Sequence, residues 1–386
     1  MRGKTAIVGV GMTDFGKHLD KSIGDLVVES YNACLEDSGF EHDEIDCLVY
    51  SSFLSGVENE PTAVYTILNE QLGYVDRPAF RVEMACSSGA AALKIAASFI
   101  VSGMHDTVMV LGFEKQNVDS RASMMDYARV ADTRYDTFTG FSGPGGIGLR
   151  YLDYMRQHPH CREEDFAAVS AKGHTYALDN PHAAFGRKTT VENVMMMPYL
   201  SYPVKMFDVT PIVDGAASFI VCKKDLAKRA RKTPVYILGC GMSIAPVTAV
   251  NMGDMGGNMN SRVAAKQAFD MAGISPKDVD VAEIYDCYTW SEISCSEEVG
   301  FFKKGEGCVA AREGRTARGG DVPINLLGGN MGRGHPPGAT AGAQLFDIVR
   351  QLRGEAGVAQ VKDAQIGMIH ELGSTLCICG VSIFGV

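Results

Sequence analysis

The feature that most constrains the fold of this chain is a weak internal repeat. Residues 9–13 read GVGMT and residues 239–243 read GCGMS. Each follows a run of apolar residues typical of a buried strand, and each copy is followed by a helix and a second strand. The first helix ends at Gly39 and the second at Gly273. Because strands and helices alternate in each copy, we expect a mainly parallel α/β core with two similarly folded halves, residues 1–232 and 233–386.

Composition narrows the class of protein. The chain has 386 residues, of which 46% are hydrophobic and 21% charged, as in ordinary globular proteins with a sizeable core. The net charge of −10 argues against a basic face for nucleic acid. No run approaches the ~20 apolar residues that span a bilayer. Eleven cysteines without C-x-x-C pairs indicate reduced thiols rather than disulfides or zinc. The sequence therefore predicts a cytoplasmic protein that binds neither nucleic acid nor membrane.

Extra material separates the repeated parts, roughly residues 114–208. It is rich in tyrosine, glycine and methionine, the methionines being Met124, Met125, Met195, Met196, Met197 and Met206. Flexible, polarizable side chains of this kind suit a cap over an apolar pocket, although ordinary core filling is slightly favoured for any single methionine. We expect a cap inserted in the first half.

One cysteine stands at the start of a helix of small residues. Cys86 lies in the segment EMACSSGAAAL, residues 83–93, and the helix continues to Val101. Unpaired amide N–H groups and the helix dipole lower the pKa of a thiol in this position, which favours a nucleophile. The alternative is a buried structural cysteine, since free cysteine is among the most buried residue types.

The second half carries a histidine in the corresponding place. His335 lies in the loop NMGRGHPPGAT, residues 330–340, just before a helix. If the halves are related by pseudo-symmetry, this loop and the Cys86 loop meet at one central site. A lone histidine is more often a structural residue, but one held opposite a candidate nucleophile favours a base.

Five short motifs together resemble the thiolase superfamily. They are CSSG at 86–89, DGAA at 214–217, GHPPGAT at 334–340, YDCY at 285–288 and HELG at 370–373. The last two resemble the H-D-C-F and H-N-x-G motifs of the sterol-carrier-type and archaeal thiolases, with Tyr285 in place of histidine. The resemblance implies an α/β thiolase fold, in which two halves form a five-layer αβαβα core, and Claisen chemistry on coenzyme A thioesters.

The resemblance also implies roles for three residues. Cys86 would take the acyl group as a thioester, and His335 would activate its sulfur. Cys287 would protonate the departing carbanion and then deprotonate incoming CoA. The pair Cys377 and Cys379, near the C-terminus, competes with Cys287 for this second role, and Cys379 lies directly before Gly380. The apolar alternation of residues 376–379 favours a buried strand there, so we assign the role to Cys287.

Further groups would surround these three. Backbone N–H groups at the Cys86 turn would stabilise the tetrahedral oxyanion. Tyr285, His370 and Gly373 are candidates for a second oxyanion site or for support of the catalytic residues. The resemblance implies no metal and no permanently bound cofactor, with CoA acting as a substrate.

The leading functional hypothesis is thiolytic cleavage of a 3-oxoacyl-CoA. The methionine-rich cap and Tyr285 favour a bulky substrate such as benzoylsuccinyl-CoA. The alternatives are a retro-aldolase acting on a 3-hydroxyacyl-CoA, a biosynthetic acetoacetyl-CoA thiolase, and a non-catalytic acyl-CoA carrier. The resemblance further implies a homodimer and a possible small partner subunit with an OB-fold and a zinc ribbon.

Overall fold

The structure is a computed structural model that describes residues 2–54, 63–117, 131–132, 134–140, 142–248 and 251–386. The strands of its main sheet are β1 (Thr5–Met12), β2 (Cys47–Ser51), β3 (Ala79–Val82), β4 (Thr107–Glu114), β7 (Gly215–Lys223), β8 (Val235–Ile244), β9 (Val281–Ile284), β10 (Ile366–Gly373) and β11 (Ile378–Gly385). The principal helices are α1 (Ile23–Ser38), α2 (Val64–Gln71), α3 (Ser88–Val101), α5 (Gly143–Gln157), α6 (Glu163–Tyr176), α7 (Val191–Met195), α8 (Lys224–Ala227), α9 (Met259–Ala272), α10 (Thr289–Glu298), α11 (Gly307–Arg312), α12 (Gly329–Arg333) and α13 (Thr340–Leu352).

The repeated glycines are explained by close packing of a helix on a strand. A Cβ atom on Gly11 of β1 would overlap the carbonyl oxygen of Ser30 in α1. A Cβ atom on Gly241 of β8 would overlap the carbonyl oxygen of Ala264 in α9 in the same way. Each half therefore lays its first helix directly on its first strand, which only glycine permits at these positions.

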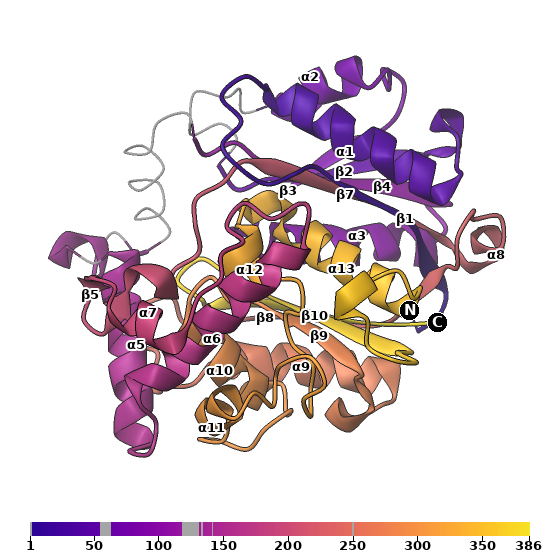
Figure 1. The fold of residues 1–386 in the computed structure, drawn as a ribbon. Helices are drawn as coiled ribbons and strands as arrows, with labels where there is room; N and C mark the ends of the chain where they lie inside the picture. Colours follow the sequence, from indigo (N-terminus) through magenta and orange to yellow (C-terminus); the bar gives the residue numbers. More distant parts are fainter. Residues whose placement is uncertain (1, 55–62, 118–130, 133, 141, 249–250) are drawn as a thin grey trace.

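The elements stack in five layers. The strand order is β3-β2-β4-β7-β1-β8-β11-β10-β9, and β1 joins β8 through only two residue pairs. Figure 1 shows the run from β3 to β1 under α1 and α2, and the run from β8 to β9 above α9 and α10. Helices α3 and α13 lie between the two runs. The predicted five-layer αβαβα core is confirmed.

The prediction of a mainly parallel core was wrong. The pairs β2–β3, β2–β4 and β9–β10 are parallel, whereas the other neighbouring pairs in this sheet are antiparallel among the described residues. Part of the reason is that β10 and β11 form a hairpin, and β7 enters antiparallel between β4 and β1. Neither arrangement follows from alternation of strands and helices alone.

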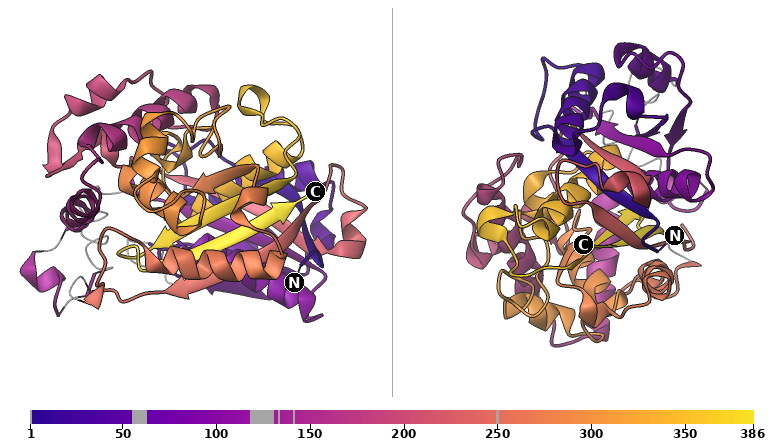
Figure 2. Two further views of the ribbon diagram at one scale, coloured as in Figure 1. Left: turned by 90° about the horizontal axis from the view of Figure 1, so that it is seen from below. Right: turned by 90° about the vertical axis from the view of Figure 1, so that its right-hand side faces the viewer.

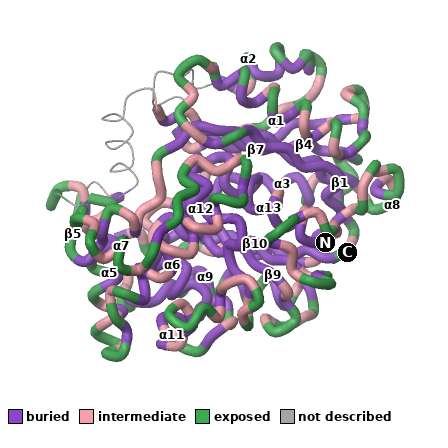
Figure 3. Tube along the Cα trace, viewed as in Figure 1, coloured by how far each residue is buried: buried purple, intermediate pink, exposed green. Residues whose placement is uncertain are grey.

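Separate apolar clusters fill the spaces between the layers. One packs α1 on the outer face of the first strand run, and another packs α9 and α10 on the outer face of the second. The middle cluster joins α3 and α13 to both runs. The central strands and helices are accordingly buried along their length (Figure 3), and the two runs are seen from other sides in Figure 2. No described helix is long and apolar enough to cross a membrane.

The segment at 114–208 packs mainly on the second half. Helix α6 lies against α10, α11 and α12, and side chains of α5 and α6 share the apolar cluster of α9 and α10 (Figure 1). Among its methionines, Met196 and Met206 are exposed, while Met124 and Met125 fall outside the described residues. The predicted boundary at 232 and 233 falls between α8 and β8 and stays a prediction.

Candidate active site

The loop before α3 presents Cys86 from a strained turn. Ala85 has φ 50°, a left-handed conformation that a residue with a Cβ rarely adopts. The Ser88 hydroxyl accepts the Met84 N–H at 2.8 Å and donates to the Ala85 carbonyl at 2.5 Å. These two bonds fix the turn that carries Cys86, whose exposed fraction is 7%.

The predicted lowering of the Cys86 pKa was wrong for the free protein. Burial raises the pKa of this thiol to about 12, and a hydrogen bond with Tyr285 only partly opposes the rise. The helix terminus does not compensate, because the N–H groups of Ser87 and Ser88 donate to the Met84 and Ala85 carbonyls at 3.1 Å each. Cys86 therefore rests as a neutral thiol and needs a base to become a nucleophile.

His335 is held as a neutral imidazole with one nitrogen available. Its Nδ1 lies 2.7 Å from Thr340 Oγ1, and that hydroxyl donates to the Pro336 carbonyl at 2.9 Å. Since the Thr340 proton is used, Nδ1 must carry the imidazole hydrogen, and Nε2 is the acceptor. Burial, followed by the charge of Arg333, lowers the pKa of His335 to about 3.

Tyr285 connects the predicted catalytic residues. Its hydroxyl lies 2.9 Å from His335 Nε2 and is also hydrogen-bonded to the thiols of Cys86 and Cys287. A phenol has one proton and two acceptor positions, so it can donate to His335 while accepting from both thiols. Burial raises the pKa of Tyr285 well above its usual value, which keeps this proton in place. The contacts thus link His335 to Cys86 through the Tyr285 hydroxyl.

A set of buried polar groups holds the His335 loop. Gln116 donates from Nε2 to the His335 carbonyl at 3.0 Å, and its own N–H donates to Asp214 at 2.7 Å. The Gly338 N–H donates to Glu114 at 3.0 Å. Asp214, from the DGAA motif, therefore acts on the site through Gln116. Glu114 ends β4, Gln116 follows it and Asp214 precedes β7, all in the first half, so no local motif in the second half indicated them.

The two competing cysteines have different hydrogen-bond partners. Cys287 shares the hydrogen bond to Tyr285 with Cys86, and after burial the charge of Cys86 raises the pKa of Cys287, which places the two thiols close together. Cys379 is instead hydrogen-bonded to Ser261 of α9. The strand predicted for residues 376–379 begins only at Ile378, because Leu376 and Cys377 lie in the turn between β10 and β11.

His370 and Gly373 support the site through backbone contacts. The His370 carbonyl accepts the Tyr285 N–H at 3.0 Å, and the imidazole Nδ1 lies 3.4 Å from the same nitrogen, while its Nε2 lies 2.8 Å from Ser261 Oγ. A Cβ atom on Gly373 would lie 2.6 Å from the Met84 carbonyl oxygen, so the end of β10 packs directly on the Cys86 loop.

Glu371, which lies between them in the strand, was not among the site residues predicted from the sequence. Its side chain is completely buried, and its carboxylate form, when present, raises the pKa of Cys86. The alternation of side chains along a strand could have indicated this residue from the sequence. Neighbouring strand residues point to opposite faces, so His370 and Glu371 cannot both face Cys86.

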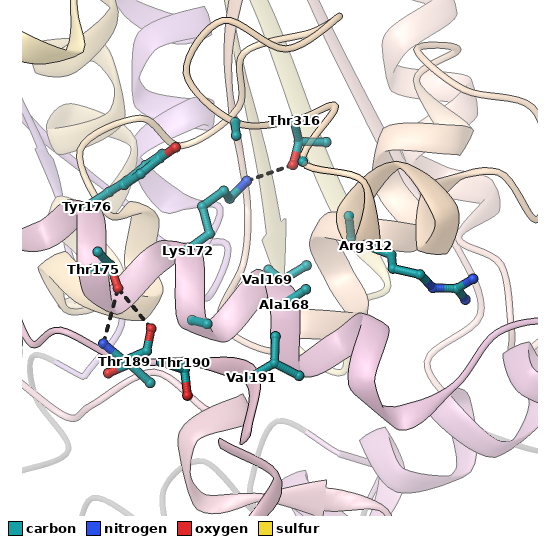
Figure 4. A pocket seen from close by; sticks show the side chains of 14 residues that line it. Ala168, Val169, Lys172, Thr175, Tyr176, Thr189, Thr190, Val191, Arg312 and Thr316 are labelled. Atoms are coloured by element: carbon teal, nitrogen blue, oxygen red, sulfur yellow. Dashed lines mark hydrogen bonds between the residues drawn. The ribbon is translucent and has the colours of Figure 1, made fainter. Parts of the chain in front are cut away.

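Two other features lie outside this site. A cavity of about 350 Å³ lies between α6, residues 189–191 and the end of α11. Lys172 lines it, and its Nζ lies 3.0 Å from Thr316 Oγ1 (Figure 4). No predicted site residue lines it. Cys161, Asp165 and Cys308 form a group with metal-ligand chemistry, but Asp165 already accepts two hydrogen bonds from Arg312.

Comparison with known proteins identifies the family. Residues 5–189 match the model of the thiolase N-terminal domain, and residues 241–386 match the thiolase C-terminal domain-like model. An acetyl-CoA acetyltransferase of Methanothermobacter thermautotrophicus is 35% identical over 381 residues, covering 98% of each chain.

More distant relatives cover nearly the whole chain as well. Sterol carrier protein 2 of Bos taurus is 28% identical over 97% of this chain and 70% of its own length. The benzoylsuccinyl-CoA thiolase subunit BbsB of Thauera aromatica is 28% identical over 96% of this chain and 94% of its own. A solved structure of an Ltp2-ChsH2(DUF35) aldolase shares the fold, with a TM-score of 0.87, 23% identity, and coverage of 100% of this chain and 98% of that one. The chain therefore belongs to the thiolase family of acyltransferase enzymes, as its motifs predicted.

Proposed function

We propose that this protein cleaves a 3-oxoacyl-CoA with coenzyme A, through a thioester on Cys86. The observation that carries the proposal is the Tyr285 hydroxyl, which is hydrogen-bonded to both thiols and to His335 Nε2. A nucleophile, a base and a second acid are thereby joined by one proton-conducting group. Thiolysis requires these three functions, and an acyl-CoA carrier requires none of them.

In the first half-reaction Cys86 becomes acylated. The Cys86 proton passes to the Tyr285 oxygen while the Tyr285 proton passes to His335 Nε2, and the sulfur adds to the 3-oxo carbon. The bond between carbons 2 and 3 then breaks, and its electron pair stays on carbon 2. Cys287 gives its proton to that carbon, so the shorter acyl-CoA leaves. The enzyme is left as acyl-Cys86, protonated His335 and the Cys287 thiolate.

The second half-reaction restores the resting state. The Cys287 thiolate takes the proton of incoming CoA, whose sulfur attacks the acyl-Cys86 carbonyl. The bond from that carbon to Cys86 breaks, and the departing thiolate regains its proton from His335 through Tyr285. The low pKa of His335 keeps its imidazole neutral in the resting protein, so Nε2 has an electron pair to accept the proton.

We propose a bulky acyl group as the substrate. The support is the similarity to a benzoylsuccinyl-CoA thiolase subunit and the cap of residues 114–208, whose helices α5 and α6 pack on the second half. Similarity to acetyl-CoA acetyltransferases supports a small substrate instead, used in either direction. A panel that contains acetoacetyl-CoA, a branched 3-oxoacyl-CoA and benzoylsuccinyl-CoA separates these cases.

One observation favours a second candidate, a retro-aldolase. The Tyr285–His335 pair could remove the proton from a 3-hydroxyl group, and this cleavage needs no acyl-cysteine. The aldolase and thiolase differ in substrate, since the first cleaves a 3-hydroxyacyl-CoA without added CoA. Loss of Cys86 would leave aldol cleavage intact.

We also propose a homodimer and a small partner subunit. The support for a dimer is β3, an edge strand that pairs with β2 and with no other strand of the described residues, and that carries the exposed Phe80. The support for a partner is the shared fold with an aldolase solved with a DUF35 protein. Light scattering of the purified chain tests the dimer, and a tagged pull-down from the native host tests the partner.

The test of function is product analysis. The protein is incubated with each 3-oxoacyl-CoA, with and without CoA, and the acyl-CoA products are identified by mass spectrometry. We expect two acyl-CoA products only when CoA is present. Cleavage of a 3-hydroxyacyl-CoA to an aldehyde or ketone, with no CoA-dependent thiolysis, would contradict the thiolase proposal and support the aldolase.

A further inference from the structure

Glu371 points into the layer that contains Cys86. It follows His370 in β10, and the His370 ring lies against Ser261 of α9, on the outer face of the strand run. Successive strand side chains alternate, so Glu371 faces inward. Its cross-strand neighbour is Gly380, where a Cβ atom would lie 2.7 Å from Ala90 Cβ in α3. Glu371 therefore faces the layer of α3, the helix that follows the Cys86 loop.

The carboxyl group has no hydrogen-bond partner in the part of the chain that the structure describes. Both oxygens are buried and unpaired, and the residue is 0% exposed. Leaving a buried polar group unpaired costs roughly 1–3 kcal/mol of folding free energy. An unpaired group of this kind therefore indicates that a ligand binds there.

Burial and neighbouring carboxyl groups favour the neutral form of Glu371. Arg333 is the cation that opposes this effect, but its guanidinium already pairs with Asp347 and lies 3.5 Å from Glu283. Burial, and then the charges of Asp286 and Glu283, raise the pKa of Glu371 well above its usual value, although Arg333 opposes this. This raised pKa favours the carboxylic acid form, whose O–H donor has no partner among the described residues.

The thiol of Cys86 lies within electrostatic reach of this donor. The pKa of Cys86 is raised by Glu371, and that of Cys379, on the neighbouring strand, is raised by it too. At the same turn, the N–H groups of Ser87 and Ser88 already donate to loop carbonyls. The predicted oxyanion donors are thus partly used, and Glu371 offers another.

We propose that Glu371 is a further catalytic residue, whose neutral carboxyl donates a hydrogen bond to the 3-oxo oxygen of the bound substrate. When the Cys86 sulfur adds to the 3-oxo carbon, the carbonyl electron pair moves to this oxygen. The Glu371 O–H bond stays intact and stabilises the new negative charge. The pair returns to the carbonyl when the bond between carbons 2 and 3 breaks. This role rests on the proposed thiolase function.

Three proteins test the role of Glu371, namely the wild type, Glu371→Gln and Glu371→Leu. Each is mixed with a saturating 3-oxoacyl-CoA that the wild type cleaves, and the rate of acyl-Cys86 formation is followed by rapid-quench mass spectrometry. Glutamine keeps a neutral donor, so its rate should stay within about tenfold of wild type. Leucine removes the donor, so its rate should fall about 10²–10³-fold with little change in substrate binding.

Stability separates a catalytic role from a structural one. Replacing an unpaired buried polar group with an apolar side chain should leave the melting temperature of Glu371→Leu unchanged or higher. Glu371→Met makes the same comparison if the leucine variant does not fold. Acylation of the leucine variant at the wild-type rate would overturn the proposal, as would a glutamine variant as slow as the leucine one. If the wild type forms no acyl-Cys86 with any 3-oxoacyl-CoA, the thiolase function itself fails, and this role fails with it.

Discussion

Removing the Tyr285 hydroxyl should stop acylation of Cys86 without unfolding the protein. Tyr285→Phe deletes one oxygen, which in the native site lies 2.9 Å from His335 Nε2 and is hydrogen-bonded to two thiols. The His335 nitrogen is left buried without its donor, which costs about 1–3 kcal/mol of folding free energy. The proton route from Cys86 to His335 is broken, and general-base assistance is typically worth about 10²–10⁴ in rate.

The rate loss corresponds to about 2.7–5.4 kcal/mol of activation free energy, at about 1.36 kcal/mol for each factor of ten. It is measured as the rate of acyl-Cys86 formation under single-turnover conditions. A second effect is expected in the free protein. The hydrogen bond with Tyr285 lowers the pKa of Cys86, so the phenylalanine variant should have a higher thiol pKa and react more slowly with iodoacetamide at the same pH.

A matched control comes from Tyr151 in α5. Its hydroxyl is also buried and lies 2.7 Å from Thr289 Oγ1. It accepts the backbone N–H of Trp290 at 3.2 Å, and neither catalytic thiol is among its hydrogen-bond partners. Tyr151→Phe removes the same atom at a similar cost in stability but should leave acylation within a few-fold of wild type. Equal acylation rates in Tyr285→Phe and wild type would refute the proton route through Tyr285.

Three further predictions concern the thiols and the packing of the repeat. Cys86→Ala should fold normally and lose thiolysis by a factor of about 10⁴ or more, measured as CoA-dependent product formation. Cys287→Ala should still acylate Cys86 but turn over poorly, whereas Cys379→Ala should mainly lower the melting temperature; the reverse pattern would exclude Cys287 as the second acid. Gly241→Ala should destabilise the fold by about 1–3 kcal/mol in urea unfolding, because its methyl group would overlap the Ala264 carbonyl.

Much of the framework could be predicted because local rules determine it. The helix at 23–38 begins at a Ser22 cap and ends at Gly39 in the left-handed conformation, as its sequence indicated. The repeated glycine motifs marked two strands on which helices pack closely. Strand directions were not predictable in this way, because β7 and β11 join the sheet through long-range pairings that no local pattern specifies.

The sequence indicated which residues form the site better than it indicated how their side chains are arranged. Cys86, Cys287 and Tyr285 are brought together, but the position of Tyr285 between the thiols and His335 depends on the packing of two halves. The pKa of Cys86 also differed from expectation, because burial outweighs the effect of the helix terminus. Glu371 lies inside the HELG motif but was not predicted as a site residue. Its role depends on the face of the strand to which its side chain points.

The most direct test of the account is the mass of the intact protein after exposure to a panel of acyl-CoAs. We expect the mass to increase by one acyl group, with peptide mapping that assigns the thioester to Cys86, and we expect free CoA to remove it. Cys86→Ala should show no increase with the same panel. A protein that cleaves its substrate while Cys86 remains unmodified, or one that carries the acyl group on another cysteine, would contradict the mechanism.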